Sequence, residues 1–202
     1  MIVCALDIKS FKEKTCFSLI EEFEVLPREK ALQKTAVREL LKIALLKMNI
    51  DSFELKKDKF GKPYLVLENG ENLFVSLSHS QNSAVCAVKK EKVGVDIEKI
   101  RIVNEKIPRR FFSEIDYQYI INSKNKKEDV ILLWSLRESL FKAVDNVDFL
   151  SFSRSVSFTD GKNKIKNKIT FLGDEFEVSY DFFDNLVLTQ AVVGEREKIF
   201  FI

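Results

Sequence analysis

The chain has 202 residues, of which 46% are hydrophobic and 32% are charged, and its 33 Lys and Arg residues nearly balance its 31 Asp and Glu residues. A chain this apolar, with a formal net charge of +2, is expected to fold, and the balance of charge argues against a nucleic-acid partner, which requires a clear excess of cations. The 6 Gly and 3 Pro residues exclude collagen-like and low-complexity classes.

The N-terminal segment is expected to form a strand instead of a signal peptide. Met1–Ile8 is rich in β-branched and apolar residues, lacks a basic start and reaches Asp7 at once. No apolar run in the sequence is long enough to span a bilayer. The cysteines Cys4, Cys16 and Cys86 are an odd number without a CxxC pair, and Cys4 and Cys86 stand in apolar runs that are expected to be buried. We therefore expect a cytoplasmic protein with free thiols and no membrane partner.

The first part of the chain is expected to contain one long helix and several short strands. Small and apolar residues recur at intervals of three and four from Ala31 to Met48, just after Pro27, which predicts a helix over about 28–48. Short β-rich runs between turn residues then predict a series of strands. These are 53–56, 63–67, 73–78, 83–89 and 93–98.

The second part of the chain repeats this order of elements. A basic and aromatic stretch, Pro108–Phe112, leads into a helical region, and a longer helix is expected over about 127–144. The strands expected after it are 155–159, 165–172, 175–182, 186–193 and 198–202. We therefore expect an α+β pseudo-duplication with two halves, 1–100 and 101–202, each with helices packed on a small, mainly antiparallel sheet.

Two acidic residues stand two apart in the predicted strand Val93–Glu98. This spacing places the carboxylates of Asp96 and Glu98 on one face of the strand, a few ångströms from one another. One interpretation is a site for a hard divalent cation such as Mg²⁺ or Mn²⁺, which would relieve their repulsion. The other is a solvated strand edge that carries two unrelated charges. The spacing alone leaves both open.

A second pair of charges lies on the long helix predicted over 127–144. Glu138 and Lys142 are four residues apart and project from one face, and Trp134, the only tryptophan, is another four residues back on the same line. The pair is either an ordinary surface ion pair or part of a partly covered site. The large ring on that line favours the covered face.

The only histidine, His79, lies between Ser78 and Ser80. Neighbouring residues on a strand point to opposite faces and the sequence has no G-x-S-x-G elbow, so a Ser–His hydrolase is not expected. His79 is either a hydrogen-bonded structural residue or a contact for phosphate. The turn Gly61-Lys62-Pro63 holds a lysine at a fixed place, and lysine is a common phosphate partner.

Four short motifs occur in one order along the chain. They are Gly61-Lys62-Pro63, Ser78-His79-Ser80, Val93-Gly94-Val95-Asp96-Ile97-Glu98 and Trp134-x-x-Arg137-Glu138-x-x-x-Lys142. In this order and spacing they resemble the phosphopantetheinyl transferases, specifically the larger monomeric type that activates carrier domains of fatty-acid, polyketide and peptide synthases. The resemblance covers residues 61–142.

The resemblance implies two similar α+β halves, with coenzyme A bound in the cleft between them as the active site. It implies transfer of the 4′-phosphopantetheine group from coenzyme A to a serine of an apo acyl or peptidyl carrier protein, with release of adenosine 3′,5′-bisphosphate. The protein is then expected to be a monomer, because two halves in one chain could form the cleft without a second subunit.

Site residues follow from the motifs that match. Asp96, Glu98 and Glu138 would hold Mg²⁺, with Mn²⁺ as a substitute. Glu138 would also take the proton of the incoming serine hydroxyl, and Lys142 would stabilise charge on the pyrophosphate and the leaving group. These roles suit phosphoryl transfer, in which positioned cations supply most of the catalysis.

Contacts with the coenzyme's phosphates are expected from the first half. By resemblance these are Lys62, Ser78 and His79. The family's N-terminal basic segment, which contacts the 3′-phosphate, is harder to align. Basic residues of the helix over 28–48 are candidates, with Lys34 and Arg28 among them.

The chain departs from the family pattern at Arg137, where lysine is usual. Arginine is planar and bidentate, so a phosphate contact there would change in geometry. Because carrier proteins are acidic around the modified serine, a basic or apolar docking surface is expected near Arg109, Arg110 and Phe111.

Two other functions share parts of this pattern. A metal-dependent nuclease also uses a carboxylate pair with a nearby lysine, but it needs a basic groove that this near-neutral chain does not suggest. A non-catalytic relative that only binds coenzyme A or a carrier protein would not need Asp96, Glu98, Glu138 and Lys142, all of which are present.

Overall fold

The computed structural model describes residues 2–7, 28–81, 83–161, 164–194 and 199–201, and side chains from residue 32 to residue 194 within these ranges. The chain forms two compact units, Met1–Lys90 with Glu197–Ile202, and Glu91–Arg196. The sequence predicted a division between residues 100 and 101. The structure divides between 90 and 91, which assigns the strand with Asp96 and Glu98 to the second unit.

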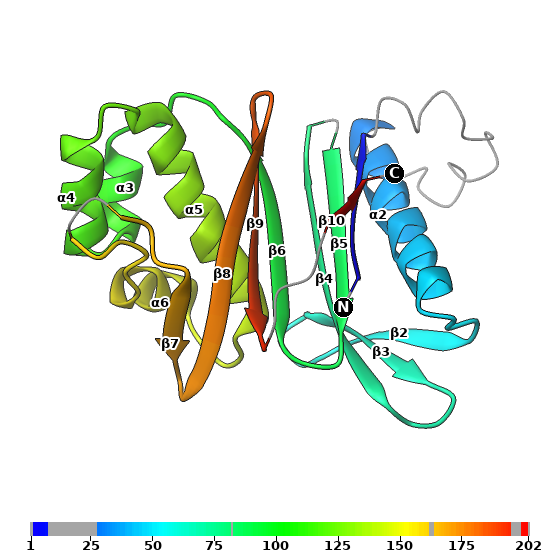
Figure 1. The fold of residues 1–202 in the computed structure, drawn as a ribbon. Helices are drawn as coiled ribbons and strands as arrows, with labels where there is room; N and C mark the ends of the chain where they lie inside the picture. The colour runs from blue at the N-terminus through cyan, green and yellow to red at the C-terminus, as the bar shows by residue number, and fades with distance from the viewer. Residues whose placement is uncertain (1, 8–27, 82, 162–163, 195–198, 202) are drawn as a thin grey trace. The chain divides into compact units, whose positions relative to one another are not determined.

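The first unit contains a six-stranded sheet and one long helix, α2 (Arg28–Lys47) (Figure 1). The strand order is β10-β1-β5-β4-β3-β2, and neighbours run antiparallel except for the parallel pair β1 and β10. The strands are β1 (Ile2–Asp7), β2 (Phe53–Lys57), β3 (Pro63–Leu67), β4 (Asn72–Ser80), β5 (Ser83–Lys89) and β10 (Ile199–Phe201). The helix and all of these strands confirm the expected elements to within a few residues.

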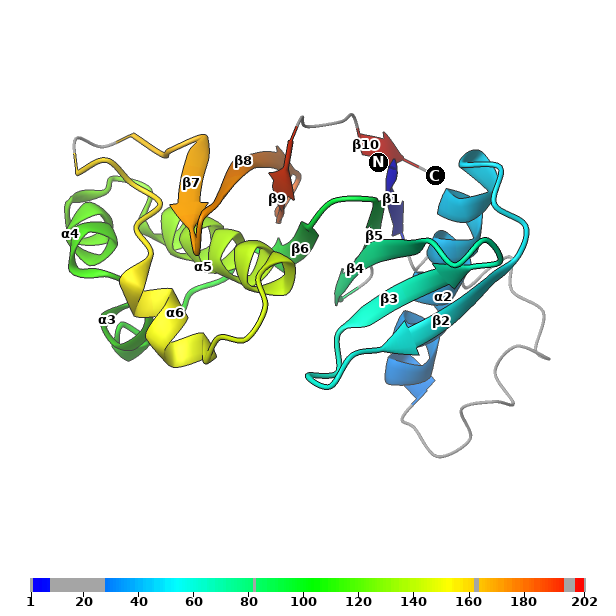
Figure 2. The same ribbon diagram turned by 90° about the horizontal axis from the view of Figure 1, so that it is seen from below.

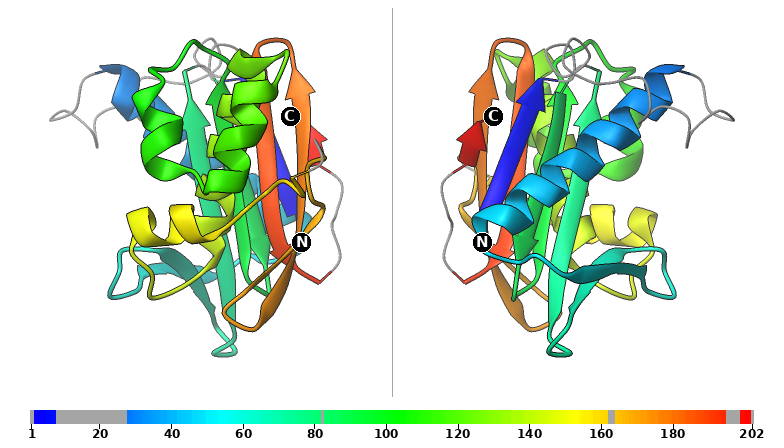
Figure 3. Two further views of the ribbon diagram at one scale, coloured as in Figure 1. Left: turned by 90° about the vertical axis from the view of Figure 1, so that its left-hand side faces the viewer. Right: turned by 90° about the vertical axis from the view of Figure 1, so that its right-hand side faces the viewer.

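Helix α2 lies along one face of the sheet formed by β1, β5 and β4 (Figure 3, right). Its buried residues repeat at the spacing that the sequence showed, because one stripe of the helix faces the sheet. They pack on apolar side chains of β3, β4 and β5, among them Cys86, whose burial was predicted. The side chains of Cys4 and Cys16 lie outside the described residues. The helix stripe consists of Leu32, Ala36, Val37, Leu40, Leu41, Ala44 and Leu45.

The second unit contains a four-stranded antiparallel sheet with the order β6-β9-β8-β7. Its strands are β6 (Val93–Lys99), β7 (Lys168–Phe171), β8 (Asp174–Phe183) and β9 (Leu186–Val193). Its helices are α3 (Lys106–Phe111), α4 (Glu114–Asn122), α5 (Lys126–Ala143) and α6 (Phe149–Ser155). All four helices lie on one side of the sheet, and α5 packs directly on β6, β9 and β8 (Figure 2).

The α+β class is therefore confirmed, with helices on one face of a mainly antiparallel sheet in each unit. Within the described residues the units differ in detail, since one sheet has six strands and the other four. The same residues contain no helix that is both long enough and apolar enough to cross a bilayer. The expectation of an active site between two halves stays a prediction.

One expected strand, 155–159, is wrong. This segment begins at the end of helix α6 and contains only an isolated bridge between Thr159 and Ile165. Helix α6 starts because the side chain of Asp148 accepts a hydrogen bond from the backbone N–H of Ser151 at 2.8 Å, which caps its first turn. The alternation of polar and apolar residues after the helix looked like a strand, but no partner strand pairs with it.

Helix α5 carries the core of the second unit. Its apolar residues are almost fully buried, and they pack against phenylalanines from α6, from the segment after it and from β8, which fill the space between helix and sheet. The central members of this core are Ile131, Leu133, Leu136, Leu140, Phe152, Phe158 and Phe176.

Gly94 lets α5 approach β6 more closely than any other residue would. A Cβ atom at this position would lie 1.8 Å from the carbonyl oxygen of Ser139 and 3.0 Å from the backbone nitrogen of Ala143. Both obstacles are helix backbone, which cannot move aside as a flexible side chain could. The close approach brings Asp96, two residues further along β6, against the helix that carries Glu138 and Lys142.

Replacing Gly94 by Ala should destabilise the protein by about 3 kcal/mol or more, because the added methyl group overlaps the backbone of α5. Gly173→Ala is the matched control, since Gly173 faces open space and only its positive φ of 89° opposes a side chain. That control should cost about 1 kcal/mol. Urea unfolding of both variants measures the difference. Equal losses would contradict the close approach.

Candidate functional site

Asp96 of β6 and Lys142 of α5 lie in contact within the second unit. The Lys142 ammonium donates to Asp96 Oδ1 at 2.8 Å and to the Val95 carbonyl oxygen at 3.1 Å. Asp96 is only 4% exposed, and the Lys142 side chain is 27% exposed. The two motifs that the sequence placed 39 to 46 positions apart therefore meet in the structure. The ion pair is largely shielded from water, which strengthens it relative to a surface pair.

The other oxygen of Asp96 is held by a buried hydroxyl. Ser135 Oγ donates to Asp96 Oδ2 at 2.8 Å and lies 2.9 Å from Thr189 Oγ1. Thr189 stands opposite Asp96 in the register of β9 on β6. Both carboxylate oxygens of Asp96 thus have a donor, as a buried carboxylate requires. Neither Ser135 nor Thr189 was identified from the sequence, because the pairing of β6 with β9 is needed to bring Thr189 there.

Glu98 lies at the more open end of the site. The Arg101 guanidinium donates to its Oε2 at 2.7 Å. Burial raises the pKa of the Glu98 carboxyl, and the charge of Asp96 adds to this, while Arg101 and Lys142 oppose it. The side chain of Arg101 is about half exposed, so water screens this ion pair. Glu98 therefore keeps part of its negative charge uncompensated.

Glu138 shows the largest perturbation in the site. Burial, followed by the negative charge of Asp96, raises its pKa from 4.5 to about 7, Lys142 opposes the shift and Glu98 adds to it. A carboxyl that titrates near neutral pH can hold or accept a proton under physiological conditions. This is the property that the proposed role of Glu138 as a base requires.

The donor chemistry of the site fits a hard divalent cation. Asp96, Glu98 and Glu138 supply only oxygen ligands, and each of the last two has a pKa raised partly by the charge of Asp96. Among the residues described by the structure, however, no three His, Cys, Asp or Glu side chains are grouped closely enough to form a ready-made metal centre. Lys142 supplies the cation that touches Asp96 in this arrangement. The three-carboxylate metal site stays a prediction.

The predicted phosphate contacts of the first unit lie on a turn and a strand. Lys62 is held in the turn between β2 and β3, where its backbone N–H donates to Asp58 Oδ1 at 2.8 Å. Ser78 and His79 are neighbours on β4, opposite Val85 and Ala84 of β5. Successive strand residues point to opposite faces, so these two side chains lie on opposite faces of β4, and their contacts with phosphate stay a prediction.

The two basic residues expected to reach the 3′-phosphate both lie on α2. Lys34 is exposed, in the first half of the helix. Arg28 is the first residue of the helix, and its side chain lies outside the described part of the chain. Their contact with a coenzyme stays a prediction.

Arg137, which stands where the family usually has lysine, is a core residue and is not exposed to a phosphate. This side chain is 0% exposed and forms a buried ion pair with Asp116, with 2.5 Å between Nη2 and Oδ2. Its guanidinium also donates to the carbonyl oxygens of Leu133, Ser153 and Val156. The position of Arg137 on the helix stripe of Leu133 and Leu140 was a signal for burial that the motif comparison overlooked.

The Arg137–Asp116 pair joins several segments of the second unit. Asp116 accepts from the backbone N–H of Phe158 and Thr159, both at 2.9 Å, and from Thr159 Oγ1 at 2.7 Å. The guanidinium lies over the ring of Phe112 at 4.1 Å and over that of Phe158 at 5.2 Å. A buried pair with this many donors and acceptors is fully satisfied, so its role is to fix the packing of α4, α5 and α6.

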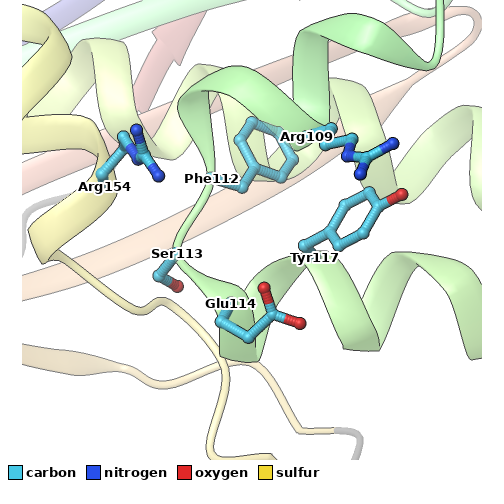
Figure 4. A pocket seen from close by; sticks show the side chains of 6 residues that line it. All are labelled: Arg109, Phe112, Ser113, Glu114, Tyr117 and Arg154. Atoms are coloured by element: carbon cyan, nitrogen blue, oxygen red, sulfur yellow. The ribbon is translucent and has the colours of Figure 1, made fainter.

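A pocket of about 550 Å³ opens between α3, α4 and α6 (Figure 4). Arg109 and Arg154 line it and are exposed. None of the site carboxylates lines this pocket, so it is separate from the contact of β6 and α5. Its lining residues are Arg109, Phe112, Ser113, Glu114, Tyr117 and Arg154.

The residues expected to form the docking surface differ in their exposure to solvent. Arg109 and Arg110 are exposed, and Arg110 stacks over the ring of Phe111 at 5.3 Å. The ring of Phe111 packs against Trp134 and Phe149, with centroids 5.5 and 6.0 Å apart. Phe111 therefore belongs to an aromatic cluster of the second unit, and Arg110 stacks on it.

All four charged residues of the site lie within the part of the chain that matches a known protein family. Residues 92–194, which include Asp96, Glu98, Glu138 and Lys142, match the model of the 4′-phosphopantetheinyl transferase superfamily. The 4′-phosphopantetheinyl transferase gsp of Aneurinibacillus migulanus is 29% identical over 130 residues, which cover 63% of this chain and 52% of that protein. The 4′-phosphopantetheinyl transferase Sfp of Bacillus subtilis is 31% identical over 86 residues, which cover 42% of this chain and 38% of that protein. The chain thus matches about half or less of the length of these curated relatives.

Replacing Glu138 by Gln should stabilise the metal-free protein, increasingly as the pH rises. The folded-state pKa of about 7 lies above the ordinary 4.5, so the folded protein keeps a proton that the unfolded chain has lost between these values. The free energy of unfolding of the wild type should therefore fall by about 2 kcal/mol as the pH rises through this window. That of Glu138→Gln should not fall in this way, because glutamine does not titrate. Urea unfolding in EDTA at about pH 5 and about pH 8 measures it.

Glu138→Asp is the control for this measurement, since it keeps a titratable carboxyl at the same position. It should retain a loss of stability with rising pH, although the shorter side chain changes its size. A Glu138→Gln variant with the same pH dependence as the wild type would show that the carboxyl is not perturbed.

Proposed function

Because the chain belongs to the 4′-phosphopantetheinyl transferase superfamily, we propose that it transfers the 4′-phosphopantetheine group of coenzyme A to a serine of an apo acyl or peptidyl carrier protein. The observation that carries the proposal is the contact of Lys142 with Asp96 beside Glu138, a carboxyl with a pKa near 7. These groups lie within the matched region and combine a cation, a metal-binding carboxylate and a base.

The proposed reaction is a displacement at phosphorus. The serine oxygen of the carrier attacks the phosphorus atom that bears pantetheine, a new P–O bond forms, and the P–O bond to the second phosphate breaks. Adenosine 3′,5′-bisphosphate leaves, and the serine proton passes to a base. Negative charge collects on the leaving oxygen, so groups of positive charge close to the pyrophosphate lower the barrier.

Asp96, Glu98 and Glu138 would hold Mg²⁺, for which Mn²⁺ could substitute. When bound, the cation would neutralise charge on the pyrophosphate. The support from this chain is electrostatic: burial and the mutual repulsion of the carboxylates raise the pKa values of Glu98 and Glu138, and a divalent cation would relieve both. Binding of the cation would require Glu138 to lose its proton.

Glu138 and Lys142 would act on the reacting groups. Glu138, deprotonated above about pH 7, would accept the serine proton. Lys142 bonds to Asp96 through one proton and to the Val95 carbonyl through another, and an ammonium group has three donors. Its third donor is the one available for the pyrophosphate or the leaving group.

The first unit would contribute to coenzyme binding. We assign contacts with the coenzyme's phosphates to Lys62, Ser78, His79, Lys34 and Arg28, and we propose that the protein acts as a monomer. The fixed turn around Lys62 and the exposure of Lys34 support two of these assignments. A cytoplasmic location, where coenzyme A and carrier proteins are available, belongs to the same proposal.

Incubation with Mg²⁺, coenzyme A and an apo acyl carrier protein should add the mass of phosphopantetheine to the carrier, as measured by mass spectrometry. Asp96→Asn and Lys142→Met should each reduce the rate by about 100-fold or more, because each removes a charge next to the reacting phosphates. Lys92→Met is the matched control: Lys92 also pairs with an aspartate of the second unit, Asp174, at 2.7 Å. This control should keep wild-type activity.

The assay also separates the alternatives. Binding of coenzyme A or of the carrier without a mass gain would identify a binding module, and Mg²⁺-dependent cleavage of DNA would identify a nuclease. Either result would overturn the proposed transfer. Full activity of both Asp96→Asn and Lys142→Met would leave the reaction in place and refute the assigned residues.

We also propose that the carrier docks on the surface around Arg109 and Arg110. Carrier proteins with acidic side chains near the modified serine would complement the exposed arginines of α3, and the neighbouring pocket adds Arg154 (Figure 4). The ring of Phe111 is packed inside the unit and supports this surface from below. Electrostatic attraction of this kind mainly raises the rate of association.

Charge reversal of both arginines, Arg109→Glu with Arg110→Glu, should weaken carrier binding about tenfold or more and leave coenzyme A affinity unchanged. Calorimetry with each ligand separately measures the two affinities. Lys124→Glu, at an exposed lysine that does not line the pocket, is the control and should change carrier binding little. An equal loss of both affinities in the double variant would contradict docking at this surface.

A further inference from the structure

We propose that Ser135 and Thr189 are positioning residues, which orient the carboxylate of Asp96 for binding a divalent cation. This inference rests on the proposed function, because it assumes that Asp96 is a cation ligand. It adds two residues that neither the motifs nor the family match assigns. Neither residue would touch the substrate; both would act through Asp96.

The two hydroxyls lie between helix and sheet at the level of Asp96. Ser135 is on α5 and Thr189 on β9, and both side chains belong to residues that are 0% exposed. Ser135 Oγ is 2.8 Å from Asp96 Oδ2 and 2.9 Å from Thr189 Oγ1. Thr189 Oγ1 is also 2.9 Å from the carbonyl oxygen of Ser135. Most of the buried residues around them on α5 are apolar, and burying a hydroxyl is costly unless it is hydrogen-bonded.

The hydrogen bonds run in one direction toward the carboxylate. Each hydroxyl has a single proton. The proton of Ser135 goes to Asp96, which has none to give when ionised, and the proton of Thr189 goes to Ser135, whose carbonyl and hydroxyl oxygens are both within reach. Thr189 therefore donates to Ser135 and helps to hold it in place, and the Ser135 hydroxyl donates to Asp96.

This chain of donors fixes the rotation of Asp96. The torsion that turns an aspartate carboxylate is soft by itself. Ser135 holds Oδ2 and Lys142 holds Oδ1, so the plane of the carboxylate is set by a donor at each end. A carboxylate has about four lone-pair positions, more than these two hydrogen bonds occupy. The orientation is thus fixed without using up the capacity to bind a cation.

Ser139 shows that a buried serine of α5 does not need this role. It is also 0% exposed and lies one helical turn after Ser135. Its hydroxyl donates to the Leu136 carbonyl oxygen of its own helix, at 3.0 Å, instead of to Asp96. Ser135 and Ser139 therefore form a matched pair that differs in the contact with Asp96.

Titration of the full-length protein with Mn²⁺ alone, with free Mn²⁺ measured by electron paramagnetic resonance, tests the inference. Ser135→Ala should weaken Mn²⁺ binding about tenfold, the lower end of the effect of removing a partner that orients a metal ligand. Ser139→Ala should leave the affinity at the wild-type value. In the transfer assay, Ser135→Ala should raise the Mg²⁺ concentration needed for half-maximal rate, and saturating Mg²⁺ should restore most of kcat.

Thr189 provides a second test in case Ser135→Ala does not fold. Thr189→Val keeps the shape and removes the hydroxyl, and should weaken Mn²⁺ binding a few-fold. Thr189→Ser keeps the hydroxyl and should bind Mn²⁺ as the wild type does. A merely structural role would change the unfolding temperature of these variants without separating their affinities for the metal.

The outcomes distinguish this inference from the proposed function. Mn²⁺ affinities equal to the wild type in Ser135→Ala and Thr189→Val, together with weakened binding in Asp96→Asn, would overturn the positioning role and leave the cation site intact. Wild-type protein that binds no Mn²⁺, either alone or with coenzyme A, would overturn the cation site and this inference with it.

Discussion

The backbone contact between α5 and β6 at Gly94 is the constraint on which the rest of the second unit depends. With no Cβ at this position, the strand approaches the carbonyl of Ser139 at a distance that no other residue allows. Two residues along the strand, Asp96 then lies within hydrogen-bond reach of both Ser135 and Lys142 of the helix. A larger separation would leave a buried carboxylate without its donors, which is costly. Gly94 therefore allows the close approach of α5 that gives Asp96 its hydrogen-bond donors.

The charges of the site are incompletely balanced by the protein itself. The charges of Asp96, Glu98 and Glu138 act on one ammonium, which is bonded to Asp96, while Arg101, the partner of Glu98, is about half exposed and screened by water. The surplus negative charge appears in the raised pKa values of Glu98 and Glu138. A protein that only needed to be stable would gain from removing one of these carboxylates. Their persistence is understandable if a cation or a proton acceptor is needed there.

Two adjacent residues of α5 lie in different environments. Arg137 points into the core, where Asp116 and two phenylalanine rings enclose its guanidinium, and Glu138 is half-buried with the charges of the site around it. Consecutive helix residues differ in direction by about 100°, so one can hold the helix in place while the next serves the site. The buried pair thus fixes the rotation of α5, on which the direction of Glu138 and Lys142 depends.

The sequence by itself determined what depends on local periodicity and on short motifs. The stripe of α2, the strands of both sheets and the long helix α5 follow from spacing, and Asp96, Glu98, Glu138 and Lys142 follow from two motifs in order. It did not predict helix α6, a short helix of seven residues whose first turn is capped by Asp148. Only the tertiary structure decided that Arg137 is a core residue paired with Asp116, and that Ser135 and Thr189 support Asp96. These partners come from other elements, 21 to 54 positions away in the hydrogen bonds that define them, and nothing in the local sequence determines which elements will pack together.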